Sequence, residues 1–559
     1  MLLSAFLALT FSLLATAGDD GGLTGPTSST EAAGYSCDPA KCKLPKCNCA
    51  STSPPGGLDP KDVPMFVIFT ADDAVQSYTL DAVNQFLAQR SNPNGCRPKM
   101  TYFTSLNYTN YTLVTDWYVA GNEIADHTMT HVGDPSEAEI NGNLVALNSL
   151  AGIPYTAIQG FRAPYLNYSV DTLKLLAKAG FTYDSSASAS IPVVEKGTDA
   201  FWPYTLDNGM ANDCLQVQGS CKGQPVLPGF WEIPMYAFFD NKGPAGPHLM
   251  DPWLDFANGA SKINDSATLE YMKNTFTAHY DRNRQPIGLY PAAAIVIRNL
   301  AESDQKQRKE VFLSLTTVSA PRYRGAAIAS VSLIALPVAT TARAVVTTAA
   351  TCFHHSLPFP WLVTKCVVWI VSNEQLLAWV QNPVPVSQLD SVPALKCAAS
   401  KIDPGAKICS GIPGNEAGLL SHCEFPDFPF YTCYGCPQIM PTPDNPNPPQ
   451  RVPDGQPARQ RVPANCSTPF WDPIAGKCTC SAADCRFSDI SRPIGPNGAN
   501  LTGGGAGGSP GTATGSSPTP SFVPFNGNSG SRSLRPALWA APFAIMVLIG
   551  ATYGVFQVV

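Results

Sequence analysis

The stretch "VPMFVIFTADDAV", residues 63–75, sets the fold class of this chain. Met65 to Phe69 form a continuous apolar run, which is typical of a parallel strand buried on both faces. Asp72 and Asp73 follow directly where this strand is expected to end. Acidic residues at the C-terminal end of a buried parallel strand lie where the active sites of α/β barrels form. The stretch therefore predicts both a fold and a site.

Further along the chain, short apolar segments again end in polar residues. They lie within "MTYFTS" (100–105), "GNEIADHTMTH" (121–131), "GIPYTAIQGFRAPY" (152–165), "LKLLAKAGFTYDSS" (173–186) and "PGFWEIPM" (228–235). In the fourth of these, an amphipathic helix is followed by Gly180 and then by a strand that ends at Asp184. Strands that alternate with helical stretches predict an α/β barrel over residues 60–290.

His127 and His131 stand four positions apart in "GNEIADHTMTHVGD", residues 121–134. Two histidines at this spacing can point the same way from a helical turn or a loop. A carboxylate from elsewhere would complete a three-ligand set that leaves room for water and substrate, as in catalytic zinc sites. The pair Asp72 and Asp73 is the expected source, because one carboxylate can bind the metal while the other accepts a proton. The alternative is a pair of surface or core histidines without a metal.

Four motifs in this order resemble the polysaccharide deacetylase family, which contains the chitin deacetylases. They are "FTADDAV" (69–75), "HTMTH" (127–131), "RAPY" (162–165) and "YDSS" (183–186). The resemblance covers about residues 60–290 and resumes at residues 368–384. The Asp-Asp-Ala form of the first motif is similar to that of eukaryotic chitin deacetylases, including fungal proteins with a glycosylphosphatidylinositol (GPI) anchor. The resemblance implies a distorted (β/α) barrel, Zn²⁺ or another divalent ion such as Co²⁺, and hydrolysis of the N-acetyl groups of a β-1,4-linked N-acetylglucosamine chain.

The resemblance also implies roles for individual residues. The metal ligands would be Asp73, His127 and His131. Asp72 would be the general base that deprotonates the attacking water. Arg162 would keep Asp72 ionised and oriented through its opposite charge.

Three further residues complete the implied site. The backbone N–H of Tyr165 would help to hold the tetrahedral oxyanion. Asp184 and Trp202 would shape the far wall of the substrate groove, with core packing as the alternative for Trp202.

The family pattern breaks after "QPIGLY", residues 285–290. The resemblance implies a histidine soon after this point, as the general acid that protonates the leaving amine. Residues 291–366 do not resemble the family, and they contain no histidine before His354 and His355. We interpret this segment as a shifted reading frame or a retained intron that replaces the general-acid motif. The alternative is a real insertion in which one of these two histidines is the acid.

The two ends of the chain predict export and anchoring. Residues 1–17 have the short apolar run and small residues of a signal peptide cleaved after Ala17. Small residues at 526–531 precede a polar spacer and an apolar tail, which is the order of a GPI signal. The attachment residue is predicted within 526–530, at Asn528, with 531–559 as the propeptide. The tail is also long enough for a transmembrane helix, which is the alternative.

Cysteine spacing predicts small modules on both sides of a deacetylase domain at 60–395. The chain has 18 cysteines, which suit disulfides in an oxidising compartment. Residues 35–50 form one Cys-rich module, for which zinc is the alternative. Residues 396–490 form a second, with an extended Pro-rich linker, and 491–530 a Gly/Ser/Pro-rich stalk. Six Asn-x-Ser/Thr acceptors are predicted glycan sites: Asn107, Asn110, Asn167, Asn264, Asn465 and Asn500.

These features predict a secreted chitin deacetylase anchored to the outer face of the plasma membrane, which makes chitosan in the cell wall. The net charge of -6 and the lack of a basic tract exclude a nucleic-acid partner. Two alternatives stay open. One is a catalytically impaired, deacetylase-like protein that binds chitin, and the other is a structural or adhesion protein of the wall.

Overall fold

The computed structural model describes the core of the chain. The described residues are 35–88, 90–212, 223–239, 247–249, 265–290, 367–397, 420–426 and 429–452, with short pieces at 454–455, 458–459, 471–472, 477–478 and 493–501. The predicted signal peptide, the anchor signal with Asn528, and the segment 291–366 with His354 and His355 lie outside the described residues.

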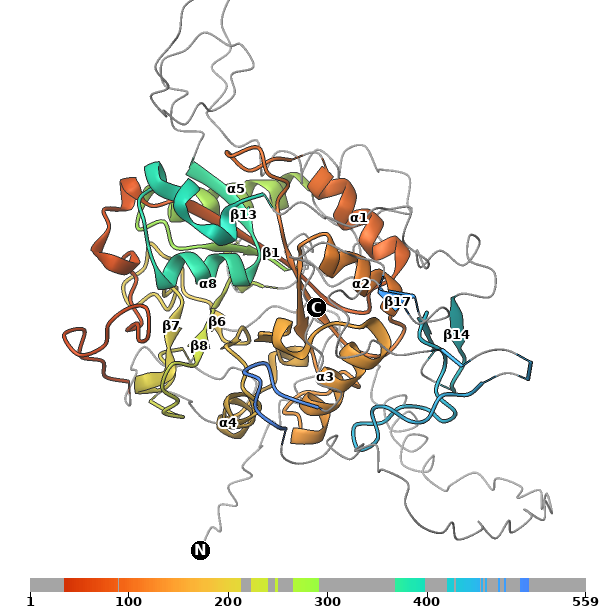
Figure 1. Ribbon diagram of the computed structural model, residues 1–559. Coiled ribbons are helices and arrows are strands. Elements are labelled where there is room, and N and C mark those ends of the chain that lie inside the picture. The colour runs from red at the N-terminus through yellow and green to blue at the C-terminus, as the bar shows by residue number, and fades with distance from the viewer. Residues whose placement is uncertain are drawn as a thin grey trace, which may run out of the picture. The chain divides into compact units, whose positions relative to one another are not determined.

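A curled, mostly parallel sheet forms the centre of the molecule, and its longest strand, β1, pairs with three others (Figure 1). The strands follow in the order β12 (Ile287–Leu289), β1 (Met65–Asp73), β2 (Thr101–Thr104), β3 (Glu123–Asp126), β4 (Gly160–Phe161), β5 (Tyr183–Asp184), β8 (Trp231–Glu232) and β7 (Tyr204–Thr205). Only β7 pairs antiparallel to its neighbour in this sheet. The first eight residues of β1 are buried, as the apolar run predicts.

Helices connect and cover these strands. They are α1 (Ser77–Ala88), α2 (Tyr111–Val119), α3 (Glu137–Ala151), α4 (Val170–Ala179), α5 (Asp265–Asp281) and α8 (Asn373–Gln381). The α4 helix begins with a capping box at Ser169 and ends at Gly180, whose φ of 93° suits glycine. The predicted order of helix, Gly180 and strand is therefore confirmed.

The register of the sheet brings the ends of the strands to one level. Asp73 pairs with Thr104, Thr104 with Asp126, and Asp126 with Phe161. The same row continues to Asp184 and then Glu232. Because parallel strands end at the same edge, polar residues far apart in the sequence become neighbours there.

The sheet curls until its two ends approach each other. Beyond β8, the strand β9 (Met235–Tyr236) pairs with β6 (Ser188–Ala189). The backbone N–H of Tyr236 donates to the Tyr290 hydroxyl just after β12, at 3.0 Å. The predicted α/β class with a distorted barrel is confirmed.

The segment after residue 366 completes the barrel. The strand β13 (Val368–Val371) pairs parallel with the first half of β1, as Met65 to Ile68 align with it. Asn92 exchanges two hydrogen bonds with the backbone of Ile370 at 2.9 and 3.0 Å. A disulfide joins Cys96 to Cys397, a residue that the sequence predicts to lie in the second Cys-rich region. The barrel domain therefore reaches at least to Cys397.

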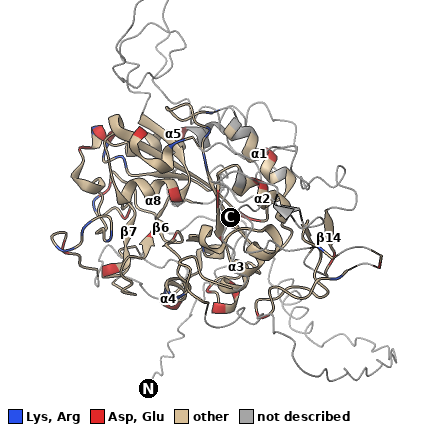
Figure 2. Ribbon diagram, viewed as in Figure 1, with Lys and Arg blue, Asp and Glu red and all other residues tan. Residues whose placement is uncertain are grey.

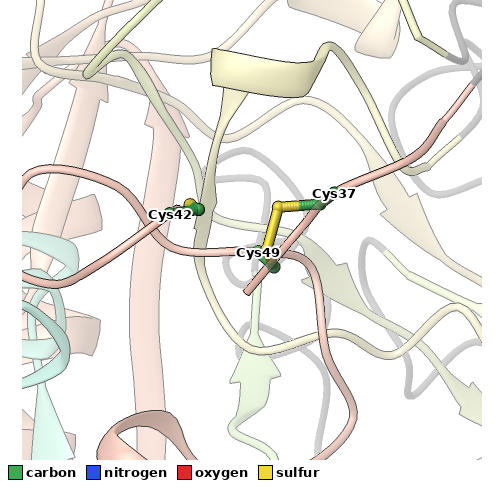
Figure 3. Close-up of side chains that lie close together, drawn as sticks. All are labelled: Cys37, Cys42 and Cys49. Carbon is green, nitrogen blue, oxygen red and sulfur yellow. A yellow bond between two sulfur atoms is a disulfide. The ribbon is translucent and has the colours of Figure 1, made fainter. Parts of the chain in front are cut away.

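The N-terminal Cys-rich module is held by disulfides. Bonds join Cys37 to Cys49 and Cys42 to Cys47, and Figure 3 shows the first of them. Three of these sulfurs lie close enough together for a metal, but all are oxidised, which excludes the zinc alternative here. The module packs on the barrel, where Thr205 N donates to Asn48 O at 3.0 Å.

The second Cys-rich region contributes a hairpin that packs against the barrel. It consists of β14 (Ser421–Cys423) and β15 (Phe430–Thr432), closed by the disulfide Cys423–Cys436. Tyr431 N donates to Thr109 O at 3.1 Å, and the Thr432 hydroxyl donates to Leu150 O at 2.8 Å. Two smaller hairpins complete the strands: β10 (Phe238–Phe239) with β11 (Pro247–His248), and β16 (Trp471–Asp472) with β17 (Lys477–Cys478).

Two segments that the sequence predicts to be loose are folded where the structure describes them. Residues 437–450 do not form an extended linker, because Pro437 and Gln450 pair as an antiparallel bridge and the loop folds back between them. Residues 493–501 form a tight turn that lies against the end of α4. Asn110 is also an unsuitable glycan site, since its side chain is buried and caps α2.

Surface charge is sparse. Figure 2 shows isolated acidic and basic positions on the described ribbons, as expected from a charged fraction of 14%.

Within the described residues, no helix combines the length and the apolar character that a membrane span requires.

Candidate metal centre and catalytic carboxylates

Three predicted ligands converge at the C-terminal edge of the sheet. Asp73 ends β1, while His127 and His131 lie in the loop after β3. Asp73 Oδ1 is 3.5 Å from His127 Nε2 and 2.9 Å from His131 Nε2. One ligand atom from each residue lies within 4.8 Å of the others. Two imidazole nitrogens and one carboxylate oxygen form a donor set that suits a catalytic Zn²⁺ or a similar divalent ion, so these residues fit the expected metal.

The histidine loop is not helical, and buried groups hold its shape. Asp126 Oδ1 accepts hydrogen bonds from Thr128 N at 2.8 Å and Asn143 Nδ2 at 3.0 Å. Glu139 of α3 accepts from both the backbone N–H and the hydroxyl of Thr130, at 2.9 and 2.6 Å. The loop is therefore tied to the sheet at one end and to a helix at the other.

Each histidine uses its second ring nitrogen for a contact that orients the ring. His127 Nδ1 donates to Arg162 O at 2.8 Å, because a carbonyl can only accept, and this leaves a lone pair on Nε2. His131 Nδ1 lies 3.2 Å from the Tyr165 hydroxyl. Both Nε2 atoms therefore face Asp73.

The charge on Asp73 is maintained by these histidines. Burial would raise the pKa of this carboxyl, but the nearby His127 and His131 side chains outweigh it and hold the pKa below the usual range. A bound cation would act in the same direction.

Asp72 is held by Arg162 beside the ligand set. Arg162 Nη1 donates to Asp72 Oδ1 at 2.8 Å and to the Thr70 hydroxyl at 2.7 Å. Both partners of the ion pair are buried, with 0% and 3% of their side chains exposed. Asp72 is thus a buried carboxylate that is held by an arginine and directly precedes the ligand Asp73, so it is the candidate to accept a proton from a water at the metal.

The rest of the Arg162 guanidinium is fixed by the turn after β5. Nε donates to Ser185 O at 2.9 Å and Nη2 to the Ser185 hydroxyl at 3.2 Å. The guanidinium lies 4.1 Å from the Phe103 ring centre. Its planar group is thus oriented on every side.

Behind Arg162 lies a buried pair of carboxyl groups, Asp184 and Glu232. Asp184 accepts hydrogen bonds from the backbone and the hydroxyl of Ser186, at 3.0 and 2.7 Å. Burial raises the pKa of Asp184 to about 6. Burial and the neighbouring Asp184 raise the pKa of Glu232 well above its ordinary value.

Backbone strain is concentrated at this edge. Asp73, Thr128, His131 and Tyr165 all have a positive φ, at 79°, 60°, 58° and 57°. Such conformations cost about 1–3 kcal/mol each outside glycine and persist where the surroundings hold them. The strain indicates that this edge is built for function.

The remaining predicted site residues occupy different environments. Tyr165 is 39% exposed and lies beside His131, with ring centres 4.8 Å apart. Trp202 is 1% exposed and packs on Trp379 in the core, which favours the packing alternative over a groove wall. Asp184 is likewise fully buried and lies behind Arg162 instead of on an open wall.

Three further histidines lie among the described residues, and each is engaged outside the metal centre. His279 bonds to Gln285 O at 3.0 Å before β12, and burial lowers its pKa to about 4. The rings of His248 and His422 stack on tyrosines. Pro291 directly follows "IGLY". The implied general acid is therefore not located among the residues that the structure describes.

Sequence reasoning missed Glu232, Ser185 and Thr70, which hold Arg162 and Asp184 in place. One signal for Glu232 was available, because "GFWEIPM" places a single acid inside an apolar strand. A charged residue in such a run is buried and needs a partner.

An α/β barrel with an Asp-His-His donor set and a buried Asp-Arg pair has the arrangement of residues that metal-dependent hydrolases use. The chain is 31% identical to chitin deacetylase 8 from Bombyx mori over 266 residues, which cover 45% of this chain and 67% of that protein. It is also 31% identical to chitin deacetylase 1 of the same species over 278 residues, which span half of that relative. The chain belongs to the polysaccharide deacetylase family, which confirms the resemblance at the level of the family. No family model matches the chain.

Solved structures of similar proteins superpose poorly on the whole chain. A chitin deacetylase from Colletotrichum lindemuthianum is 14% identical, with 45% of this chain and 83% of that chain covered and a TM-score of 0.23. A polysaccharide deacetylase from Bacillus cereus is 13% identical, with 45% and 87% covered and a TM-score of 0.22. The family assignment therefore rests on the sequence relatives and the fold on the strand pairing of this chain.

Proposed function

We propose that this protein hydrolyses the N-acetyl groups of chitin, or of a closely related N-acetylglucosamine polymer, with the help of a divalent metal ion. The observation that carries the proposal is the convergence of Asp73, His127 and His131 beside the buried Asp72–Arg162 pair. The named relatives support chitin as the substrate class, because both are chitin deacetylases.

The residues of the chain divide the chemistry between them. A divalent ion held by the three ligands would polarise the acetamide carbonyl and lower the pKa of a nearby water. Asp72 would accept a proton from that water as general base, and Arg162 orients its carboxylate through a hydrogen bond. The backbone N–H of Tyr165 is proposed to stabilise the negative charge on the acetamide oxygen.

A catalytically impaired chitin-binding protein is the second candidate. It is favoured by one observation, the absence of a histidine soon after "IGLY" in the printed sequence. Without a general acid the amine leaves poorly, although substrate binding through the barrel edge would persist. An active enzyme would need a general acid other than a histidine soon after "IGLY".

Acetate release from chitin oligomers tests both candidates. The full chain should release acetate when supplied with Zn²⁺ or Co²⁺, and a chelator should stop the release. The variant Asp73→Ala should lose the metal-dependent activity, whereas Asp171→Ala, on the exposed face of α4, should retain it. Binding to chitin without any acetate release would favour the impaired protein, and unchanged release in Asp73→Ala would refute the mechanism.

We propose further that the protein is exported, like fungal GPI-anchored chitin deacetylases, and tethered at the outer face of the plasma membrane, within the cell wall. The signal-peptide and anchor-signal patterns at the two ends of the sequence support this. Treating intact cells with a phosphatidylinositol-specific phospholipase should release the protein into the medium. Retention after this treatment, together with loss on detergent extraction, would favour a transmembrane tail instead.

A further inference from the structure

We propose that Glu232 is a positioning residue that donates its carboxyl proton to Asp184 and thereby holds the turn that orients Arg162. The inference rests on the proposed deacetylase function for its catalytic consequence. Its structural part, a neutral Glu232 in the folded protein, can be tested without activity.

The two carboxyl groups face each other inside the protein. Asp184 and Glu232 are direct partners in the β5–β8 register, and both are 0% exposed. Their side chains are close enough for each to shift the pKa of the other. Glu232 Oε1 accepts from Ala187 N at 3.2 Å, whereas no N–H or O–H group among the described residues reaches Oε2.

This geometry requires a proton between the two groups. Ionised carboxylates only accept hydrogen bonds, so two of them cannot bond to each other. Two buried carboxylates in contact cannot both stay ionised. Asp184 already accepts two hydrogen bonds from Ser186, which favour its charged form. The proton therefore belongs on Glu232.

A chain of contacts connects this proton to Arg162. The Ser186 hydroxyl donates to Asp184 and accepts from Ala163 N at 2.8 Å. Its neighbour Ser185 receives two bonds from the Arg162 guanidinium, and its hydroxyl donates to Ile233 O at 2.9 Å. Without the proton of Glu232, Asp184 would lose one hydrogen-bond donor. It would then compete with Arg162 and Ala163 for the hydroxyl groups of Ser185 and Ser186.

The charged and titratable groups around Glu232 agree with this placement. Besides Asp184, they are Arg162 from the strand-end loop, Tyr204 of β7 and Tyr236 of β9. Burial and Asp184 raise the pKa of Glu232, while Arg162 lowers it by a smaller amount. The pKa values of both tyrosines are raised well above their ordinary value, so they are neutral across the working range.

Two variants of the full chain separate a donor from an acceptor at this position. Glu232→Gln keeps the shape and supplies a permanent N–H donor, whereas Glu232→Met keeps the volume and supplies none. Glu139→Gln is the matched control, because both oxygens of Glu139 accept bonds from Thr130 and an amide loses one of them. That control is expected to lower the melting temperature.

The first readout is the melting temperature between pH 5 and 8, without added metal. The folded-state pKa of Glu232 is raised, so its contribution to stability is present below the unfolded pKa and is lost as the pH rises. Glu232→Gln should therefore melt close to wild type at pH 5 and increasingly above it toward pH 8. A Gln variant that is destabilised at every pH as strongly as Glu232→Met would overturn the proposal, since Glu232 would then be an ionised acceptor.

The second readout is acetate release at saturating metal. Glu232→Gln should keep kcat within about 3-fold of wild type, while Glu232→Met should lose about 10-fold or more in kcat with little change in KM. Equal losses in both variants would contradict the donor role. If the wild type releases no acetate, the proposed function fails, and the melting profile still decides whether Glu232 carries the proton.

Discussion

Replacement of Arg162 by methionine tests the central ion pair of the site. The guanidinium is fully buried and donates to Thr70, to Asp72 and twice to Ser185. Methionine fills a similar volume but removes every one of these donors. Asp72, of which only 2% is exposed, would then be a buried charge without a cation.

The magnitude follows from the contact distance and the burial. At 2.8 Å and an effective dielectric constant of about 20, the Coulomb attraction of two unit charges is about 6 kcal/mol. Desolvation of both groups offsets part of this, and removing one partner of a buried pair typically costs about 3–5 kcal/mol. We therefore expect Arg162→Met to lower the free energy of unfolding by about 3–5 kcal/mol at pH 7. Acetate release should fall at least 100-fold, because the base loses its orientation.

Urea unfolding of the full chain at pH 7 measures this effect. Arg284→Met is the matched control, because Arg284 is 9% exposed and lies over Tyr280 at the other end of the barrel. The control should lose only about 0.5–2 kcal/mol, the range of a cation–π contact, and should keep its activity. The double variant Asp72→Asn with Arg162→Met should regain much of the lost stability, because no buried charge remains. If the double variant is as unstable as Arg162→Met alone, the destabilisation does not come from an unpaired Asp72, and the reasoning is refuted.

Three further predictions concern the Cys96–Cys397 disulfide, the pH dependence of stability and the binding of the metal. Opening the Cys96–Cys397 disulfide by Cys397→Ser should lower the free energy of unfolding by about 2–5 kcal/mol in calorimetry, because the bond spans 301 residues; no change would mean that β13 is held without it. Burial and Glu374 raise the pKa of Glu123 to about 7, so the wild type should lose stability as the pH rises from about 5 to 8, and Glu123→Gln should flatten this loss in urea titrations. Zn²⁺ at about 100 times its Kd should stabilise the fold by about 2.7 kcal/mol, and equal stabilisation of His131→Ala would place the ion elsewhere.

The sequence was sufficient for the features that depend on chain order and strand direction. The apolar run before Asp72 and Asp73 predicts a buried parallel strand, and parallel strands must deliver their ends to one edge. For this reason the sequence alone assigns His127, His131 and Arg162 to one site. Their meeting follows from the topology and requires no knowledge of side-chain packing.

The features that the sequence did not predict depend on packing across the sheet. Glu232 meets Asp184 only because two short strands align at one register position. Trp202 follows a polar stretch, which is compatible with a residue of the substrate groove. Its ring instead packs in the core against Trp379, which comes from the far end of the domain. Cys397 pairs with Cys96 because β13 lies beside β1 in the sheet. The spacing of the cysteines along the chain does not predict this pairing.

The strand pairing also limits what can replace residues 291–366. Leu289 at the end of β12 aligns with Phe69, whereas Val368 at the start of β13 aligns with Met65. The chain must therefore run back along about four residues of β1, roughly 13 Å at the rise of a strand. It must also cross from one side of β1 to the other, because Val67 pairs with both strands.

A parallel crossover of this kind needs about a dozen residues or more, usually with a helix. A sequence in which "IGLY" continues directly into "VWIV" could not form both pairings. If residues 291–366 are a frame shift or a retained intron, the mature transcript should encode a histidine soon after "IGLY" and then a crossover of at least about 12 residues. Sequencing the transcript across codons 280–375 decides this. A transcript that matches the printed sequence would leave the acid to His354 or His355 and favour the chitin-binding alternative, and one that joins the two strands directly would contradict the pairing of β12 or β13 with β1.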